Sequence, residues 1–106
     1  MSVLNLIGKK GTVEILRLLS LGVNSFTKIK ENLNNSGLSL STRTLAQRLN
    51  ELEGEYLIEK NNGKYYITQK GKEFLDIIEN ILAWEKRWED IKINKIVIDI
   101  LKDRDS

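Results

Sequence analysis

The sequence contains no cysteine, no histidine and no proline. The absence of cysteine excludes disulfides and thiolate chemistry, and the absence of both cysteine and histidine excludes zinc-finger ligation and imidazole catalysis. A nucleophile and its base could be drawn only from Ser/Lys or carboxylate pairs. The 15 acidic residues are scattered, however, and no glycine-rich phosphate loop is present. We therefore expect a protein that is not an enzyme and that uses no metal or cofactor.

Long apolar runs are absent as well. No stretch reaches the roughly 20 apolar residues that a membrane helix needs, and the N-terminus lacks the apolar core of a signal peptide. We therefore expect a cytoplasmic protein with no membrane partner. At 106 residues, 41% hydrophobic and 30% charged, the chain has the size of one domain and enough apolar residues for a core.

Charge is distributed unevenly along the chain. Residues 1–72 carry 11 Lys/Arg against 6 Asp/Glu, a net charge of +5, whereas residues 73–106 carry 6 against 9, a net charge of −3. A basic front and an acidic rear suit a protein that meets a polyanion on one side only. The alternative is chance variation in a charged surface. We divide the chain into a binding core (1–72) and a C-terminal helical segment (73–106) within one structural domain.

The segment from Leu40 to Leu52 has the strongest helical signal. Leu45, Leu49 and Leu52 recur at i, i+4 and i+7, and Ser41 occupies the position of an N-cap. Leu40 and Leu45 have the spacing of a hydrophobic staple. The other face carries side chains that can donate to phosphates and base edges: Thr42, Arg43, Thr44, Gln47 and Arg48. Because a recognition helix reads the major groove with its N-terminal half, this segment is the predicted reading helix.

The segments before this helix complete a helix-turn-helix. One helix is predicted over residues 12–21 and ends at Gly22. A second is predicted over residues 28–33, capped by Thr27 and followed by a turn at residues 34–37. Lys28 and Lys30 lie on the outer side of the second helix, where we expect them to contact the DNA backbone.

A β-hairpin is predicted directly after the reading helix. Residues 56–60 and 64–68 are rich in aromatic and branched side chains and flank an Asn/Gly turn. The tip of the hairpin carries four further candidates for DNA contact: Lys60, Asn61, Asn62 and Lys64. The alternative is a solvated turn with no binding role.

The C-terminal third is predicted to be a helix that Thr68 caps and that runs at least to Trp88. We extend the helix through residues 91–101, although their β-branched composition also suits a strand. Residues 1–7 are predicted to form a short helix or arm that packs on a partner or on the C-terminal helix. The surplus of apolar residues predicts a homodimer. Its expected interface consists of Leu4, Phe74, Ile77, Ile78, Ile81, Trp84, Trp88 and Ile91.

The order helix, helix, reading helix, hairpin and long helix is typical of the winged helix-turn-helix, an α+β fold that is mostly helical. At residue level the chain resembles the HxlR-type branch of the MarR-like transcription regulators. The matching segments are residues 8–12 (GKKGT), 15–16 (IL), 26–29 (FTKI), 40–53 (LSTRTLAQRLNELE), 56–58 (YLI), 66–71 (YITQKG) and 82–84 (LAW), with Trp88. The resemblance covers about residues 8–88 and implies a dimeric DNA-binding repressor or activator.

The chain departs from that family in three places. The family's N-terminal cysteine region is missing, which excludes a thiol-based redox sensor. Ser41-Thr42 opens the reading helix where the family often has Ser-Pro. The wing is shorter than the family usually shows, so PadR-type and other archaeal winged-helix regulators stay in consideration as near neighbours.

Side-chain chemistry separates the roles within the reading helix. Arginine forms a forked pair with the two major-groove acceptors of guanine, and glutamine pairs in the same way with adenine. Arg43 and Gln47 are therefore the predicted readers, whereas the short side chains of Ser41, Thr42 and Thr44 are expected to hold phosphates. Arg48 could do either. For both arginines the alternative is a solvated helix face with an ion pair to Glu51 or Glu55.

The sequence thus predicts a sequence-specific regulator that binds double-stranded DNA. A homodimer would bind an inverted repeat whose half-sites lie ~34 Å apart. The alternative is a winged helix used for protein–protein contact, which would place acids or large apolar residues outward on the reading helix. Single-strand or RNA binding would need exposed aromatic residues on a sheet, for which only Tyr65 and Tyr66 are candidates. No small-molecule effector is predicted, and the Trp84/Trp88 pair is assigned to packing.

Overall fold

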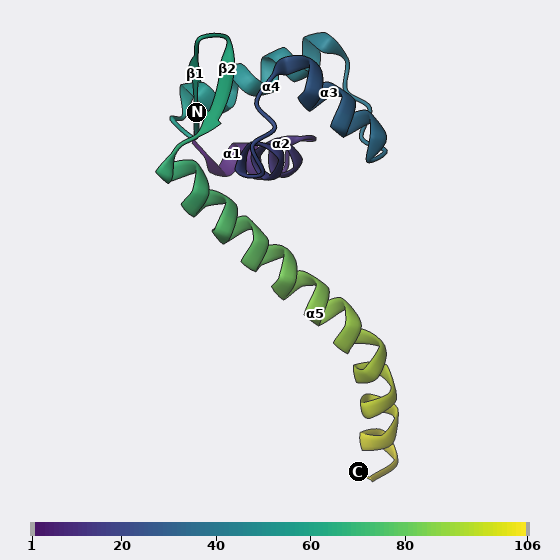
Figure 1. Cartoon of the computed structure of the whole chain (residues 1–106). Helices are drawn as coiled ribbons and strands as arrows, with labels where there is room; N and C mark the ends of the chain where they lie inside the picture. The colour runs from purple at the N-terminus through teal and green to yellow at the C-terminus, as the bar shows by residue number, and fades with distance from the viewer. Residues whose placement is uncertain (1, 106) are drawn as a thin grey trace. The chain divides into compact units, whose positions relative to one another are not determined.

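The computed structural model describes the backbone of residues 2–105 and the side chains of residues 2–90. Figure 1 shows the elements in chain order. They are α1 (Leu4–Ile7), α2 (Thr12–Ser20), α3 (Phe26–Asn35), α4 (Thr42–Gly54), β1 (Ile58–Asn61), β2 (Lys64–Ile67) and α5 (Gln69–Asp105). This is the predicted order of the winged helix-turn-helix. The chain forms two compact units, Met1–Asp76 and Ile77–Ser106, and α5 contributes residues to both.

The core of the first unit lies among α2, α3, α4 and the hairpin. α2 contacts α1, α3 and β2, and α4 contacts β1. Fully buried aliphatic side chains fill the space between them, among them Ile15, Leu16, Ile29, Leu33, Leu45, Leu49 and Leu52. Burying one such side chain stabilises the fold by about 1.5–3 kcal/mol, so the leucine stripe fixes which face of α4 is turned inward.

The N-terminal helices show one difference from the sequence prediction and one agreement. α3 begins at Phe26, and its N-cap is Ser25, whose hydroxyl accepts from the Lys28 amide, so the predicted cap at Thr27 is wrong. Residues 4–7 form the predicted short helix, α1, which contacts α2. Leu6 is fully buried, whereas Leu4 is 70% exposed.

The hairpin pairs β1 with β2 in antiparallel register, with Asn61 opposite Lys64. Asn62 and Gly63 form its two-residue turn and have φ angles of 52° and 75°. Positive φ at both positions is the signature of a type I′ turn, whose twist matches that of the strands it joins. The Tyr65 amide donates to the Asn24 carbonyl at 2.9 Å, which ties β2 to the segment before α3.

A tight junction connects the hairpin to α5. The Thr68 hydroxyl accepts from the Gly71 amide at 3.0 Å, as predicted for the N-cap of α5, and donates to the Tyr56 carbonyl at 2.6 Å. The Thr68 amide donates to the Leu57 carbonyl. A Cβ on Gly71 would lie 2.0 Å from that same carbonyl oxygen, so only glycine fits at this position.

The second unit consists of the part of α5 that begins at Ile77. Its backbone is helical through Asp105, so the choice of helix over strand for residues 91–101 is confirmed. Four apolar residues are substantially exposed: Ile77, Ile81, Trp84 and Trp88. Phe74 and Ile78, by contrast, are already buried in the single chain at 7% and 1% exposure, so neither has surface for a partner. The Ile91 side chain lies outside the described residues.

Candidate nucleic-acid interface

The N-terminus of α4 is capped as the sequence predicts. The Ser41 hydroxyl accepts from the Thr44 amide at 3.0 Å and lies 2.9 Å from the Thr44 hydroxyl. Leu40 and Leu45, the two members of the expected staple, are both buried. The capping bonds occupy part of the hydrogen-bonding capacity of Ser41 and Thr44, whereas Thr42 is exposed. The phosphate contacts expected for Ser41, Thr42 and Thr44 stay predictions.

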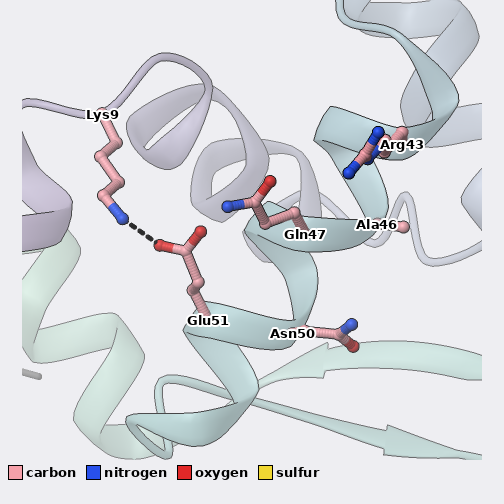
Figure 2. Close-up of a pocket in the computed structure, with 6 residues that line it drawn as sticks. All are labelled: Lys9, Arg43, Ala46, Gln47, Asn50 and Glu51. Carbon is pink, nitrogen blue, oxygen red and sulfur yellow. Dashed lines mark hydrogen bonds and ion pairs between the residues drawn. The ribbon is translucent and has the colours of Figure 1, made fainter.

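The outward face of α4 borders an open hollow of about 610 Å³. Arg43, Ala46, Gln47 and Asn50 line it from α4, and Lys9 and Glu51 complete its edge (Figure 2). Arg43, Gln47 and Asn50 are exposed. We call the four α4 residues from Arg43 to Asn50 the reading surface. Positions i, i+3, i+4 and i+7 of a helix share one face, so this grouping follows from helical geometry.

The sequence-based selection omitted Ala46, Asn50, Lys9 and Glu51. Helical spacing from Arg43 could have identified Ala46 and Asn50. Lys9 lies 42 residues before Glu51 in the chain, and nothing in the local sequence connects them. Asparagine can pair with adenine through two hydrogen bonds, and a small apolar side chain such as alanine can contact a thymine methyl group. The reading surface therefore presents arginine, glutamine, asparagine and alanine, four side chains suited to base edges.

Arg48 does not lie on the outward face, which corrects the sequence prediction. Its side chain is only 11% exposed. The Arg48 Nε donates to the Lys10 carbonyl at 2.9 Å, and its Nη1 donates to Glu51 Oε1 at 3.0 Å. The ion pair with Glu51 that the alternative named is present, but it lies on a buried side chain and not on a solvated helix face. Arg48 connects α4 to the loop between α1 and α2.

Glu51 joins two basic residues at the edge of the hollow. Lys9 Nζ donates to Oε2 of Glu51, while Arg48 binds Oε1 (Figure 2 shows the Lys9 contact). Hydrogen bonding from Lys9 is the largest cause that holds the pKa of Glu51 below its ordinary value, and the charges of Arg48 and Lys9 act in the same direction. Burial acts against them, because it disfavours the charged carboxylate. The carboxylate is therefore ionised throughout the neutral range.

The remaining candidates lie on α3 and on the hairpin. On α3, Lys28 is exposed and Lys30 is half-buried. The four candidates at the hairpin tip, Lys60, Asn61, Asn62 and Lys64, are all exposed. Lys60 Nζ lies 5.5 Å from the ring centroid of Tyr65, its partner on the opposite strand, close enough for a cation–π contact across the hairpin. The hairpin therefore presents two lysines and two amides to solvent.

Metal binding and membrane insertion are two other functions to consider for this chain. Among the described residues, no group of three or more Asp or Glu side chains is placed to hold a metal ion. Within that same part of the chain, no helix has the combination of length and apolarity that a bilayer span requires.

Comparisons with known proteins agree with this fold. Residues 11–86 match the family model described as winged helix-turn-helix. The chain is 55% identical over 105 residues, 99% of each chain, to an uncharacterised HTH-type transcriptional regulator of Methanocaldococcus jannaschii. Among solved structures, it is similar to quinone-bound YodB from B. subtilis, with a TM-score of 0.68 and 27% identity over 80% of this chain and 92% of that one. Diamide-treated YodB gives a TM-score of 0.67 and 26% identity over 80% of this chain and 87% of that one.

Proposed function

Because the chain belongs to the winged helix-turn-helix family of transcriptional regulators, we propose that it reads a specific sequence in double-stranded DNA with α4. The family consists of regulators and not of enzymes, in agreement with the sequence prediction. The observation that carries the proposal is the reading surface itself. Arg43, Gln47 and Asn50 are exposed along one face of a capped helix whose opposite face is anchored in the core.

The dimensions of α4 suit a short run of base pairs. From Arg43 to Asn50 the helix rises about 10 Å at ~1.5 Å per residue. Base pairs stack at about 3.4 Å, so this length corresponds to roughly three steps of B-DNA. In the proposed arrangement Arg43 pairs with guanine, and Gln47 and Asn50 face the following base pairs. Lys28, Lys30 and the four tip residues of the hairpin contact phosphates or the minor groove and carry no major-groove specificity.

The test is selection of binding sites from random duplex DNA with the intact protein. Recovery of a defined motif, bound far more tightly than random duplex at the same salt concentration, supports sequence-specific reading. The alternative function, a winged helix that contacts another protein, predicts that no motif is enriched above the starting library.

We further propose that two copies associate through α5. A line of apolar residues on α5 is spaced alternately by four and three residues: Ile77, Ile81, Trp84 and Trp88, followed in the sequence by Ile91. This spacing is typical of the residues that form the interface, or seam, of a coiled coil. The first four are 40–56% exposed in the single chain. Exposed aromatic and branched side chains in one line are costly in water unless a second surface covers them. Such a dimer would place two reading helices on an inverted repeat with half-sites ~34 Å apart.

Sedimentation at micromolar concentration tests the dimer. The wild-type chain is expected to sediment with twice the protomer mass, and Ile81→Glu is expected to sediment as a monomer because it places a charge in the seam. Asn80→Glu adds the same charge to an exposed residue beside the seam and should stay dimeric. A monomeric wild-type protein would contradict the proposal.

The proposed subfamily is the HxlR-type branch of the MarR-like regulators. Its support is the segment at residues 66–71, where the Thr68 cap and the close approach at Gly71 give the shared sequence motif a structural reason.

A further inference from the structure

An acidic residue at the edge of the reading surface needs a physical explanation. Glu51 lines the same hollow as Arg43 and Gln47 (Figure 2). A bare carboxylate there would repel the phosphates of the proposed ligand. In this chain the carboxylate is not bare. Lys9 binds one oxygen and Arg48 binds the other, so the three groups together carry a net charge of +1 and the repulsion is cancelled locally.

The network also holds the carboxylate in one orientation. The Glu51 side chain is only 12% exposed, and its two basic partners come from different parts of the fold. Arg48 is itself fixed by its second bond, to the Lys10 carbonyl. A carboxylate has about four acceptor positions on its two oxygens, so positions stay open for a further donor after both cations are bound.

Gln47 is the donor placed to use them. It precedes Glu51 by one helical turn, and side chains four residues apart on a helix are neighbours. Figure 2 shows the amide nitrogen of Gln47 directed toward the Glu51 carboxylate across the edge of the hollow. In agreement with this orientation, the Gln47 side chain is the last and smallest of the causes that lower the Glu51 pKa. An amide that gives one N–H to Glu51 retains a second N–H and its carbonyl oxygen. Adenine requires that donor and acceptor together, in a fixed arrangement that a freely rotating amide does not provide.

We propose, on the basis of the proposed function above, that Glu51 is a positioning residue that fixes the side-chain amide of Gln47 for reading a base pair. Lys9 and Arg48 hold the carboxylate, and the carboxylate holds the amide. Glu51 and Lys9 therefore control discrimination at the base pair that faces Gln47 without reading it themselves.

The primary test compares Glu51→Gln with Glu53→Gln on the selected duplex and on variants with single base-pair changes. Both substitutions remove one negative charge from α4, and Glu53 is exposed with no assigned contact to the reading surface. The base pair that faces Gln47 is the one whose discrimination Gln47→Ala abolishes. Glu51→Gln is expected to reduce discrimination there by roughly 5- to 10-fold, the lower part of the range for a forked contact, and to leave the base pair of Arg43 unaffected. Glu53→Gln should leave discrimination unchanged at every position.

A double variant separates positioning from general stability. In the Gln47→Ala background, Glu51→Gln should cause no further loss of discrimination, because the amide it positions is gone. Thermal unfolding of each variant, followed in parallel, confirms that the compared proteins are folded at the assay temperature. A purely structural role would weaken binding to all duplexes alike and would overturn the proposal.

A second pair of variants tests the same idea if Glu51→Gln does not fold. Lys9→Met removes the ammonium that holds one carboxylate oxygen, and Lys10→Met removes the same charge from the exposed neighbour. Only Lys9→Met should lower discrimination at the base pair of Gln47. Equal effects of the two variants would overturn the proposal. Absence of any selected motif for the wild type would instead overturn the proposed function, so the two failures are distinguishable.

Discussion

Arg43 and Arg48 lie five residues apart on α4 and have the same side chain, yet the structure predicts opposite consequences for replacing them with alanine. Arg43 is exposed on the reading surface. Arg48 is buried and bonded to the Lys10 carbonyl and to Glu51. Arg43→Ala should therefore impair specific DNA binding with little effect on folding, whereas Arg48→Ala should impair folding first. The same loss of positive charge in both variants makes them controls for each other.

The cost of Arg48→Ala follows from the partners it abandons. A hydrogen bond to a charged group contributes about 1.5–3 kcal/mol, and an unsatisfied buried acceptor costs about 1–3 kcal/mol. Leaving a buried ion without any partner costs about 3–5 kcal/mol. Because Lys9 still neutralises Glu51 in this variant, we expect the loss of stability to be smaller than that. We expect the free energy of unfolding to fall by about 2–3 kcal/mol, a large share of the roughly 5–15 kcal/mol that holds a domain folded.

The cost of Arg43→Ala appears in binding. Losing a forked contact to guanine should weaken binding to the selected duplex by about 1–3 kcal/mol and remove discrimination at one base pair. An exposed residue with no structural partner contributes within about ±0.5 kcal/mol to stability, so the unfolding transition should move little.

Urea unfolding and competition binding at fixed salt concentration measure both quantities for each variant. The reasoning is refuted if Arg48→Ala unfolds at the wild-type urea concentration while losing discrimination at a single base pair. It is equally refuted if Arg43→Ala loses stability and retains full specificity.

Three further predictions follow from the structure. Gly71→Ala should lower the free energy of unfolding by about 2–4 kcal/mol in a urea titration, because its Cβ would meet the Leu57 carbonyl at 2.0 Å and disturb the Thr68 junction. Lys64→Ala should weaken binding to all duplexes alike and reduce the slope of log K against log salt by about 1, as measured by titration at several salt concentrations. Because the pKa of Glu51 is lowered from 4.5 by Lys9 and Arg48, its contribution to stability is complete above about pH 4.5 and is lost as pH falls below that value. As pH is lowered, the free energy of unfolding should therefore fall more steeply for the wild type than for Glu51→Gln, as measured by urea titration at several pH values.

Local sequence was sufficient for features that depend on neighbouring residues. The cap at Ser41, the leucine stripe, the hairpin around Asn62-Gly63 and the cap at Thr68 each arise from residues within a few positions of one another. The start of α3 was misplaced because Ser25 and Thr27 are both capable N-caps. The local sequence does not choose between them, because either hydroxyl could accept from an amide in the first turn.

The placement of Arg48 was wrong for a different reason. At 100° per residue, Arg48 lies only about 40° around the helix from Leu52, at the border of the buried stripe, whereas Asn50 lies about 20° from Arg43. Residue type suggested a DNA contact for Arg48, and helical position indicated Asn50. Helical position determines whether the side chain is buried, because the buried face of α4 is wider than the three leucines and includes the residue at its border.

The helical position of Arg48 does not explain why a charged guanidinium is tolerated at the border of the buried face. The Lys10 carbonyl and the Glu51 carboxylate satisfy it, and the first of these comes from a loop 38 residues earlier in the chain. Burial of an unpaired charge would be prohibitive, so Arg48 and Glu51 have to be considered together with the α1–α2 loop. The same loop supplies Lys9 to the other carboxylate oxygen. Arg48 and Glu51 are thus held in place from outside the helix. A helix with the sequence of residues 42–54 transplanted without that loop would lose both contacts and leave the two side chains in other positions.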